Sequence, residues 1–163
     1  MPQANTNEYF RLFFETTQKI LSARNVQETL DSLVQKTVVA LGIKAGGLRL
    51  IDEKTNCLEQ VAAFGLSEVY LNKGALNADQ SIPEVLVGQP VCIKDAFSDP
   101  RIQYPEALRA EGINTILSVP VIAAEKVIGV LRLYSAEPRD YSDEELEFIS
   151  ALAEVGGLAI ANA

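Results

Sequence analysis

The sequence predicts a single α+β domain built around an antiparallel sheet. Three observations support this prediction. The chain has 163 residues, a length that suits one hydrophobic core. Segments with the period of strands occur as two hairpins, and these hairpins lie between amphipathic helices. The order is helix, helix, strand, strand, small helices, strand, strand, helix, which favours an antiparallel sheet over a doubly wound parallel one.

Two amphipathic helices open the chain. Over residues 8–23, apolar and aromatic residues recur at helical spacing with polar residues between them. The second helix begins after Asn25, whose side chain can cap it while Glu28 reaches back to the cap. We expect this helix to stop at Gly42, because glycine readily adopts the left-handed conformation that ends helices.

The period then changes to that of strands. The first two predicted strands are joined by a turn-like stretch, and so are the last two, so each pair reads as a hairpin. The strand between the hairpins starts at Pro90, which suits an edge strand or a strand start. The predicted strands are 45–52, 57–64, 90–94, 115–123 and 126–135.

Short helices are expected between the hairpins, and a long helix ends the chain. Residues 65–78 resemble a loop with some helical character, 81–87 suit a short helix, and 105–112 suit another that opens on a proline. Ser142 and Glu145 form a capping box that should start the terminal helix.

Composition excludes several functions. The formal net charge of −8 opposes binding to nucleic acid, whose phosphates are neutralised by Lys and Arg. No apolar run approaches the ~20 residues that span a bilayer, so we expect no membrane segment. The polar N-terminus lacks the features of a secretory signal, which predicts a cytoplasmic protein.

The chain contains no histidine, and this absence disfavours most enzyme chemistry. Histidine is the usual general base near neutral pH and the commonest metal ligand. We therefore expect neither catalysis nor a metal site. Cys57 and Cys92 are too few for a disulfide scaffold or a thiolate metal site, and we expect them to be reduced.

Several segments resemble, in their order and spacing, the GAF domain, a sensory module shared by phytochromes, cyclic-nucleotide phosphodiesterases, sensor kinases and transcriptional regulators. The resemblance covers roughly residues 25–162. It is carried by 48–52 (LRLID), 88–91 (GQPV), 118–121 (SVPV), 127–131 (VIGVL), 141–146 (YSDEEL) and 158–163 (LAIANA).

The resemblance implies a profilin-like fold. Its antiparallel sheet carries the N- and C-terminal helices on one face, and loops and short helices close over a small-molecule pocket on the other. We divide the chain into an N-terminal helix, residues 1–24, that could serve dimerisation, and a GAF domain over residues 25–163.

The family's well-defined ligands fit this chain poorly. Bilin-binding members carry a Cys-His pair in the pocket helix, so we expect neither a covalent bilin nor haem here. Cyclic-nucleotide members tend to carry an Asn-Lys pair after the penultimate strand, where this chain has residues 134–137 (YSAE). Members that reduce free methionine sulfoxide use several pocket cysteines, and only Cys92 is near that region. Because resolving chemistry needs a second thiol within reach, a thiol-based reductase that rests on Cys92 is the less favoured, enzymatic alternative.

We expect an unidentified small-molecule ligand, and Arg49 and Arg132 are its first candidate contacts. Both lie in the middle of strands that should be central neighbours, where two forked guanidinium groups could bind a carboxylate or phosphate. The alternative is that each pairs with a glutamate of the helical layer or extends its charged end to solvent. A register change of one residue would turn either side chain to the opposite face of the sheet, so both possibilities stay open.

Residues 95–104 are the expected lid over the pocket, because loops carry most ligand contacts. Aromatic side chains would supply its walls and charged ones would orient the ligand. The alternatives are a surface loop stapled by an Asp-Arg pair and, for the aliphatic members, plain core packing. The remaining predicted ligand-binding residues are Ser81, Ile82, Val85, Asp95, Phe97, Arg101 and Tyr104.

The terminal helices carry more apolar surface than one sheet face needs, which indicates a homodimer. Small residues in the last helix, among them Gly156 and Gly157, would let a partner helix approach closely. Full burial within one chain is the alternative. The predicted interface residues are Phe10, Phe13, Phe14, Phe148 and Val155.

These features together predict a small-molecule-binding sensory domain of a bacterial-type signalling protein, such as a sensor histidine kinase or a regulator. The last residues are helical in character and carry no Gly or Pro terminator, which we interpret as a chain that continues into an effector domain. The alternative from another class is a ligand-free dimerisation module, in which the cavity is filled by the domain's own side chains.

Overall fold

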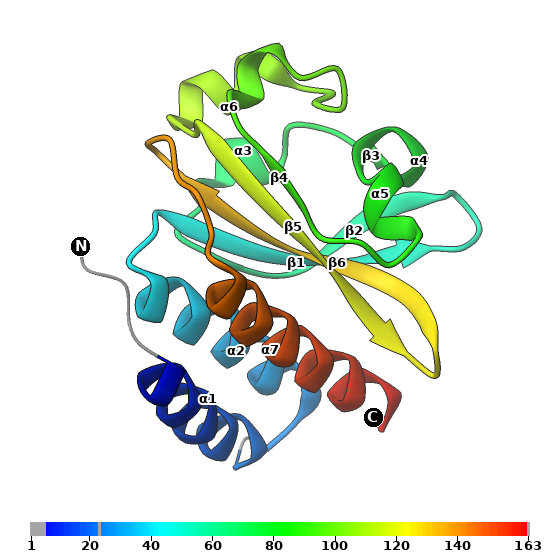
Figure 1. Cartoon of the computed structure of the whole chain (residues 1–163). Coiled ribbons are helices and arrows are strands. Elements are labelled where there is room, and N and C mark those ends of the chain that lie inside the picture. Colours follow the sequence, from blue (N-terminus) through cyan, green and yellow to red (C-terminus); the bar gives the residue numbers. More distant parts are fainter. Residues whose placement is uncertain (1–5, 23, 163) are drawn as a thin grey trace.

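Six antiparallel strands form the centre of the fold in the computed structural model, which describes residues 6–22 and 24–162 (Figure 1). The strands run in the spatial order β3-β2-β1-β6-β5-β4, with β1 and β6 at the centre. Every neighbouring pair is antiparallel, as the hairpins predicted. The strands are β1 (Ala45–Asp52), β2 (Cys57–Phe64), β3 (Leu76–Asn77), β4 (Val91–Ile93), β5 (Thr115–Ala123) and β6 (Lys126–Ser135).

Three long helices lie on one side of the sheet and the short helices on the other, so the predicted α+β arrangement is confirmed (Figure 1). The long helices are α1 (Thr6–Leu21), α2 (Val26–Leu41) and α7 (Asp143–Ala161). The short ones are α3 (Glu68–Leu71), α4 (Ala78–Ser81), α5 (Pro83–Leu86), the 3₁₀ turn η1 (Ala96–Ser98) and α6 (Pro105–Glu111). In the described part of the chain, no helix is long and apolar enough to cross a membrane.

Helices α2 and α7 pack directly on the sheet, and α1 lies outside them as a further layer (Figure 1). The main core is aliphatic and includes Leu33 of α2, Leu131 of β6 and Leu152 of α7, all inaccessible to solvent. The ring centres of Tyr9 in α1 and Phe148 in α7 are 5.4 Å apart. The opposite face of the sheet carries two smaller apolar clusters beneath the short helices.

The helix caps follow the predicted chemistry with one exception. The Ser142–Glu145 capping box is complete, and Gly42 ends α2 in the left-handed conformation with a φ of 65°. The Asn25 side chain accepts a hydrogen bond from the backbone N–H of Glu28. The Glu28 carboxylate, however, accepts from the backbone N–H of Arg24, one residue before the cap, so the second half of that capping box is wrong.

The helix predicted over residues 81–87 is also wrong in its bounds. Ser81 ends α4 and Pro83 begins α5, because the proline ring keeps the preceding residue, Ile82, out of helical conformation (φ −137°, ψ 48°). The first helix ends at Leu21, and its expected end, Ala23, lies outside the described residues.

The two small residues proposed to admit a partner helix serve packing inside the chain instead. Gly157 of α7 lies directly against the backbone of Ile122 in β5, and a Cβ atom there would overlap the Ile122 carbonyl oxygen. A Cβ atom on Gly156 would lie 3.2 Å from Leu33 of α2. Both glycines therefore let the terminal helix approach the sheet and α2 closely.

This packing predicts that Gly157→Ala destabilises the domain. Alanine has higher helix propensity by about 1 kcal/mol, but the new methyl group must push α7 away from β5, a strain of about 1–3 kcal/mol. The net change should lower the melting temperature, and thermal unfolding followed by circular dichroism measures it. Leu158→Ala is the control, because Leu158 is 62% exposed on the same helix. Equal stability of Gly157→Ala and wild type would contradict this account.

Candidate functional site

The candidate site lies on the sheet face that turns away from α2 and α7. Arg49 of β1 pairs with Val130 of β6, and Arg132 of β6 pairs with Gly47 of β1. Val130 belongs to an apolar cluster under the short helices, and the intervening Leu131 points into the helical core. Because side chains alternate along strands, both arginines face the short helices. The structure thus decides a question that the sequence left open.

Arg132 is buried and hydrogen-bonded to its surroundings. Its Nε donates to Ser118 Oγ at 3.2 Å, and its Nη2 donates to both the carbonyl oxygen and Oγ of Ser81 at 2.9 Å each. Ser81, a predicted site residue at the end of α4, therefore lies beside the guanidinium group. The hydrogen bonds between Arg132 and Ser81 connect the central strand β6 to the short helix α4 that covers it.

Arg49 is equally buried but poorly satisfied. Its side chain is 4% exposed, and its Nε and Nη2 atoms have no hydrogen-bond partner among the described residues. A buried donor without a partner costs about 1–3 kcal/mol, and more when it is charged. Native structures seldom carry such groups unless a ligand, an ion or water satisfies them.

A third cation, Lys73, joins the arginines from the connection between α3 and β3. Its Nζ donates to the carbonyl oxygen of Tyr70 at 3.2 Å and lies 3.8 Å from the centre of the Tyr70 ring. Burial, together with the charges of Arg49 and Arg132, lowers the pKa of Lys73 to about 7. Tyr70 is 3% exposed, and burial raises the pKa of its hydroxyl.

We call Arg49, Lys73 and Arg132 the cation cluster. No carboxylate among the described residues forms an ion pair with any of them. The charge of Glu111 in α6 acts on Lys73 and raises its pKa, but less than the opposing effects lower it. The Glu111 carboxylate accepts hydrogen bonds from the backbone N–H of Ser67 (2.7 Å) and its hydroxyl (2.6 Å). An uncompensated cluster of this kind favours a bound anion.

The hollow beside the cation cluster is nearly closed. Its volume is 10 Å³, about the space of one water molecule. The Tyr104 hydroxyl donates to the carbonyl oxygen of Ala75 at 2.6 Å, and the backbone N–H of Asn77 donates to Gln103 Oε1 at 2.6 Å. These two bonds hold the segment before β3 against the segment before α6, so a larger ligand has to part them. The lining residues are Tyr70, Lys73, Leu76, Ser81, Ile102, Gln103, Tyr104 and Arg132.

Two predicted polar contacts of the lid do not reach this hollow. Arg101 donates to Asp99 through Nε (2.9 Å) and Nη2 (2.6 Å), and to Glu84 through Nη1 (2.8 Å). Its hydrogen bond holds the pKa of Asp99 below its usual range. The alternative of a loop stapled by an Asp-Arg pair is therefore correct for Arg101. Asp95 is exposed and accepts from the Ser98 hydroxyl at 3.0 Å, away from the cation cluster.

The predicted apolar residues divide between the hollow and the core. Tyr104 lines the hollow. Ile82 and Val85 are fully buried in the apolar cluster that contains Val130, so core packing is their role. Phe97 is half-buried in the other small cluster, and the Arg109 guanidinium lies 5.2 Å from its ring centre.

The residues predicted for a dimer interface differ in their exposure to solvent. Phe148 is 5% exposed and packs against Tyr9 of α1, so within one chain it belongs to the helical core. Phe13 and Val155 are partly buried against the helical core. Phe10 and Phe14 are 72% and 56% exposed and lie one turn apart on α1.

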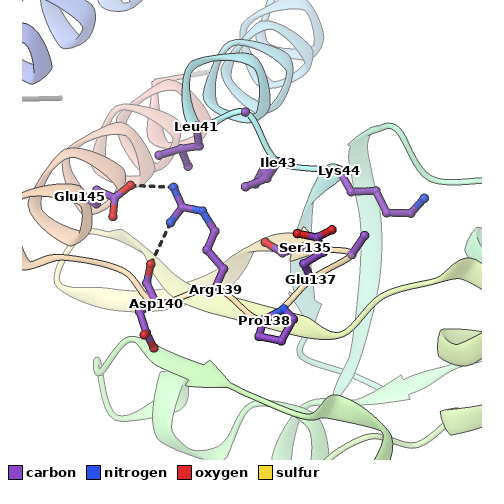
Figure 2. Close-up of a pocket in the computed structure, with 11 residues that line it drawn as sticks. Leu41, Ile43, Lys44, Ser135, Glu137, Pro138, Arg139, Asp140 and Glu145 are labelled. Atoms are coloured by element: carbon purple, nitrogen blue, oxygen red, sulfur yellow. Dashed lines mark hydrogen bonds and ion pairs between the residues drawn. The ribbon is translucent and has the colours of Figure 1, made fainter. Parts of the chain in front are cut away.

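A more voluminous hollow, which the sequence did not predict, opens at the end of the sheet on the side of the long helices (Figure 2). It measures 610 Å³ and lies between the α2–β1 connection and the loop that leads from β6 into α7. Its lining residues are Leu41, Gly42, Ile43, Lys44, Ser135, Ala136, Glu137, Pro138, Arg139, Asp140 and Glu145.

The charges of Arg139 and Glu145 in this hollow are already paired with each other. Figure 2 shows Arg139 between Glu145 and Asp140: its Nη2 donates to Glu145 Oε2 at 2.7 Å and its Nη1 to the Asp140 carbonyl oxygen at 3.1 Å. Burial alone would raise the pKa of Glu145, but hydrogen bonds from Arg139 and from the Ser142 N–H outweigh it and lower the pKa. The groove thus offers weaker attraction to a charged ligand than the cation cluster does.

The two cysteines lie on separate strands. Cys57 belongs to β2 and Cys92 to β4, and β1, β6 and β5 lie between these strands in the sheet. Burial raises the pKa of the Cys92 thiol, which leaves less thiolate at neutral pH. Within one chain the two thiols therefore cannot resolve one another, as thiol-based reduction would require.

The chain was compared with protein families, curated proteins and solved structures. A family model described as GAF domain matches residues 23–161. A Salmonella typhimurium protein of the phosphoenolpyruvate-dependent phosphotransferase system is 28% identical over 141 residues, which cover 85% of this chain and 19% of that protein. The chain thus spans about a fifth of the length of this curated relative.

Solved structures with the same fold include two GAF domains. The one from a Coxiella burnetii phosphoenolpyruvate-protein phosphotransferase (ptsP) has a TM-score of 0.87 and 23% identity, covering 98% of this chain and 96% of that one. The blue-light absorbing form of the Thermosynechococcus elongatus PixJ GAF domain has a TM-score of 0.69 and 20% identity, covering 84% and 85%.

The unequal hydrogen bonding of the two arginines predicts opposite effects on stability. Arg49→Met should raise the melting temperature in low-salt buffer by about 2–4 °C, because it removes a buried charge without a partner, a gain of about 1 kcal/mol. Arg132→Met should lower it, because Ser81 and Ser118 lose their hydrogen bonds. Differential scanning calorimetry of both variants measures this contrast, and equal destabilisation by both would show Arg49 to be a structural residue.

Proposed function

The chain belongs to the GAF domain family, and from that premise we propose that it is a sensory module that binds a small anionic molecule at the cation cluster. The observation that carries this proposal is Arg49, a buried guanidinium group whose Nε and Nη2 have no hydrogen-bond partner among the described residues. A forked donor suits the two oxygens of a carboxylate or the oxygens of a phosphate. Arg132 and Lys73 would share the negative charge of the ligand.

A signal can travel from this site along β6. Arg132 lies three residues before the end of that strand, and the loop that follows leads through Arg139 into α7. The ion pair between the partly buried Arg139 and the buried Glu145 joins this loop to the first turn of α7. An anion that draws Arg132 toward it would shift β6 against α7. Such a shift transmits a signal only if the ligand binds the two arrangements with unequal affinity.

The curated relative supports a phosphotransferase as the parent of this domain, in place of the sensor histidine kinase expected from the sequence. The match to a protein of the phosphoenolpyruvate-dependent phosphotransferase system covers 85% of this chain. We therefore propose that the domain regulates a protein of that type and has no catalytic activity of its own. The separated cysteines support the absence of thiol-based reduction.

We further propose that the domain is a homodimer through α1. Phe10 and Phe14 form an exposed apolar pair on that helix, and α1 also contacts α7 through Tyr9. A second copy that covered this pair would therefore lie on the helical layer through which the signal leaves. Large exposed aromatic side chains on one helix face favour such an interface.

A ligand-free interaction module is the competing function, and the small size of the hollow supports it.

A thermal-shift screen against sulfate, inorganic phosphate, succinate and acetate separates the sensory function from the interaction module. The sensory function predicts that at least one anion raises the melting temperature of wild type and of the control Arg11→Met by at least about 2 °C more than that of Arg49→Met. Arg11 is exposed on α1, so general salt effects act equally on all three proteins. Equal shifts in all three would exclude binding at Arg49 by these anions and favour the interaction module.

The dimer is tested by Phe10→Glu combined with Phe14→Glu. Charges at these exposed positions should weaken self-association by at least about tenfold, because they would be buried without partners, while the fold stays intact. Sedimentation velocity over a concentration series measures association. Val69→Glu is the matched control, since Val69 is 82% exposed on α3, far from the long helices. A wild-type protein that sediments as a monomer at high concentration would refute this part of the proposal.

A further inference from the structure

Lys73 differs from the other two cations in its origin and its chemistry. The arginines project from the central strands, whereas Lys73 belongs to the connection that covers the hollow, next to the segment fastened by Tyr104 and Gln103. An arginine keeps its charge at every physiological pH, but a lysine can lose its proton when it is buried. Lys73 is therefore the member of the cluster whose charge can respond to what the hollow contains.

Each element packed around Lys73 bears on its charge. Arg49 from β1 and Arg132 from β6 oppose a positive charge on Nζ, and Glu111 from α6 favours it. The face of the Tyr70 ring, from α3, also favours the cation, while the ring of Tyr134 in β6 packs edge-on against Tyr70 at 6.0 Å. Tyr104 lines the same hollow, and its hydroxyl donates a hydrogen bond to the Ala75 carbonyl oxygen. The two arginines thus outweigh the one carboxylate in their effect on the Lys73 charge.

We propose that Lys73 is the specificity-determining cation of this site, and that it takes up a proton together with the anion, so that the domain selects doubly charged anions over singly charged ones. This inference rests on the proposed anion-binding function. A monoanion can be neutralised by the arginines alone. A dianion leaves negative charge next to Nζ, where a protonated lysine can pair with it.

The direction of the pH dependence follows from proton linkage. Burial and the two arginines lower the pKa of Lys73 to about 7 in the empty domain, and a bound anion counters the effect of the arginines and so raises it. Well below pH 7 the ammonium is protonated in both states, and affinity is constant. Above pH 7 the occupied state holds more protons than the empty one, so affinity for the anion falls as the pH rises.

Sulfate is a suitable probe, because its charge does not change between pH 6.5 and 8.5. We expect the dissociation constant of sulfate for the wild-type protein to rise about tenfold over this range, as measured by isothermal titration calorimetry. Lys73→Arg should bind sulfate with the same affinity at both pH values. Lys73→Met should also lose the pH dependence, bind sulfate more weakly at pH 6.5, and prefer sulfate over nitrate less than wild type does.

The titration of Lys73 itself can be followed by NMR through its ¹³Cε resonance, assigned by its loss in Lys73→Arg. We expect the midpoint to lie near pH 7 without sulfate and to move up by at least about one pH unit with saturating sulfate. This readout does not depend on whether the arginine variant folds. A midpoint that sulfate leaves in place would overturn the inference.

The outcomes separate this inference from the proposed function. If sulfate binds wild type and not Arg49→Met, but with equal affinity at pH 6.5 and 8.5, the anion site stands and the role of Lys73 is refuted. If sulfate binds neither protein, or binds both equally, the proposed site for sulfate is refuted and the inference falls with it.

Discussion

The constraint around which this domain is organised is an uncompensated positive charge on the sheet face beneath the short helices. Arg49 and Arg132 project from the two central strands, Lys73 approaches them from above, and no carboxylate of the described residues pairs with any of the three. Bringing like charges together away from water opposes folding. The aliphatic layer between α2, α7 and the other sheet face supplies the opposing stability.

The division of the sheet into two different faces explains how such a site can be held in place. Leu48 and Leu131 pair with each other across β1 and β6 and pack into the helical core, so Arg49 and Arg132, their neighbours in sequence, face the other side of the sheet. Gly47, opposite Arg132, makes room for the Gln60 side chain, because a Cβ atom at this position would lie 2.8 Å from Gln60 Nε2. The loop clamp of Arg101, Asp99 and Glu84 then fastens the covering segments without using a member of the cation cluster.

The long elements and the position of the two arginines were predictable, because they follow from periodic patterns. The strands 45–52, 57–64, 115–123 and 126–135 have the bounds that alternation predicted, and the neighbouring central strands brought Arg49 and Arg132 together. Their common face was not predictable, since it depends on register. The burial of Phe148 against α1 was not predictable either, because its helix is apolar on several sides and nothing in the sequence tells which side α1 covers.

The contribution of Lys73 could not be found in the sequence. Residues 65–78 have no hydrophobic period, and their conformation is set by distant contacts, such as the pairing of Leu76 with Leu58 and the bond from Tyr104 to Ala75. For Arg101 the sequence predicted a ligand contact that the structure does not show. Its position in the lid suggested that contact, but its guanidinium group donates to Asp99, two residues earlier. Short irregular segments of this kind are decided by tertiary structure rather than by local propensity.

Anomalous diffraction from crystals soaked in selenate, a heavier analogue of sulfate, tests the central claim most directly. The account predicts a selenium peak on the sheet face beneath the short helices, with a selenate oxygen within hydrogen-bonding distance of Arg49 Nη2 and the anion close to Arg132 and Lys73. Selenate bound only on the outer surface, with the Arg49 guanidinium contacted by water alone, would contradict it.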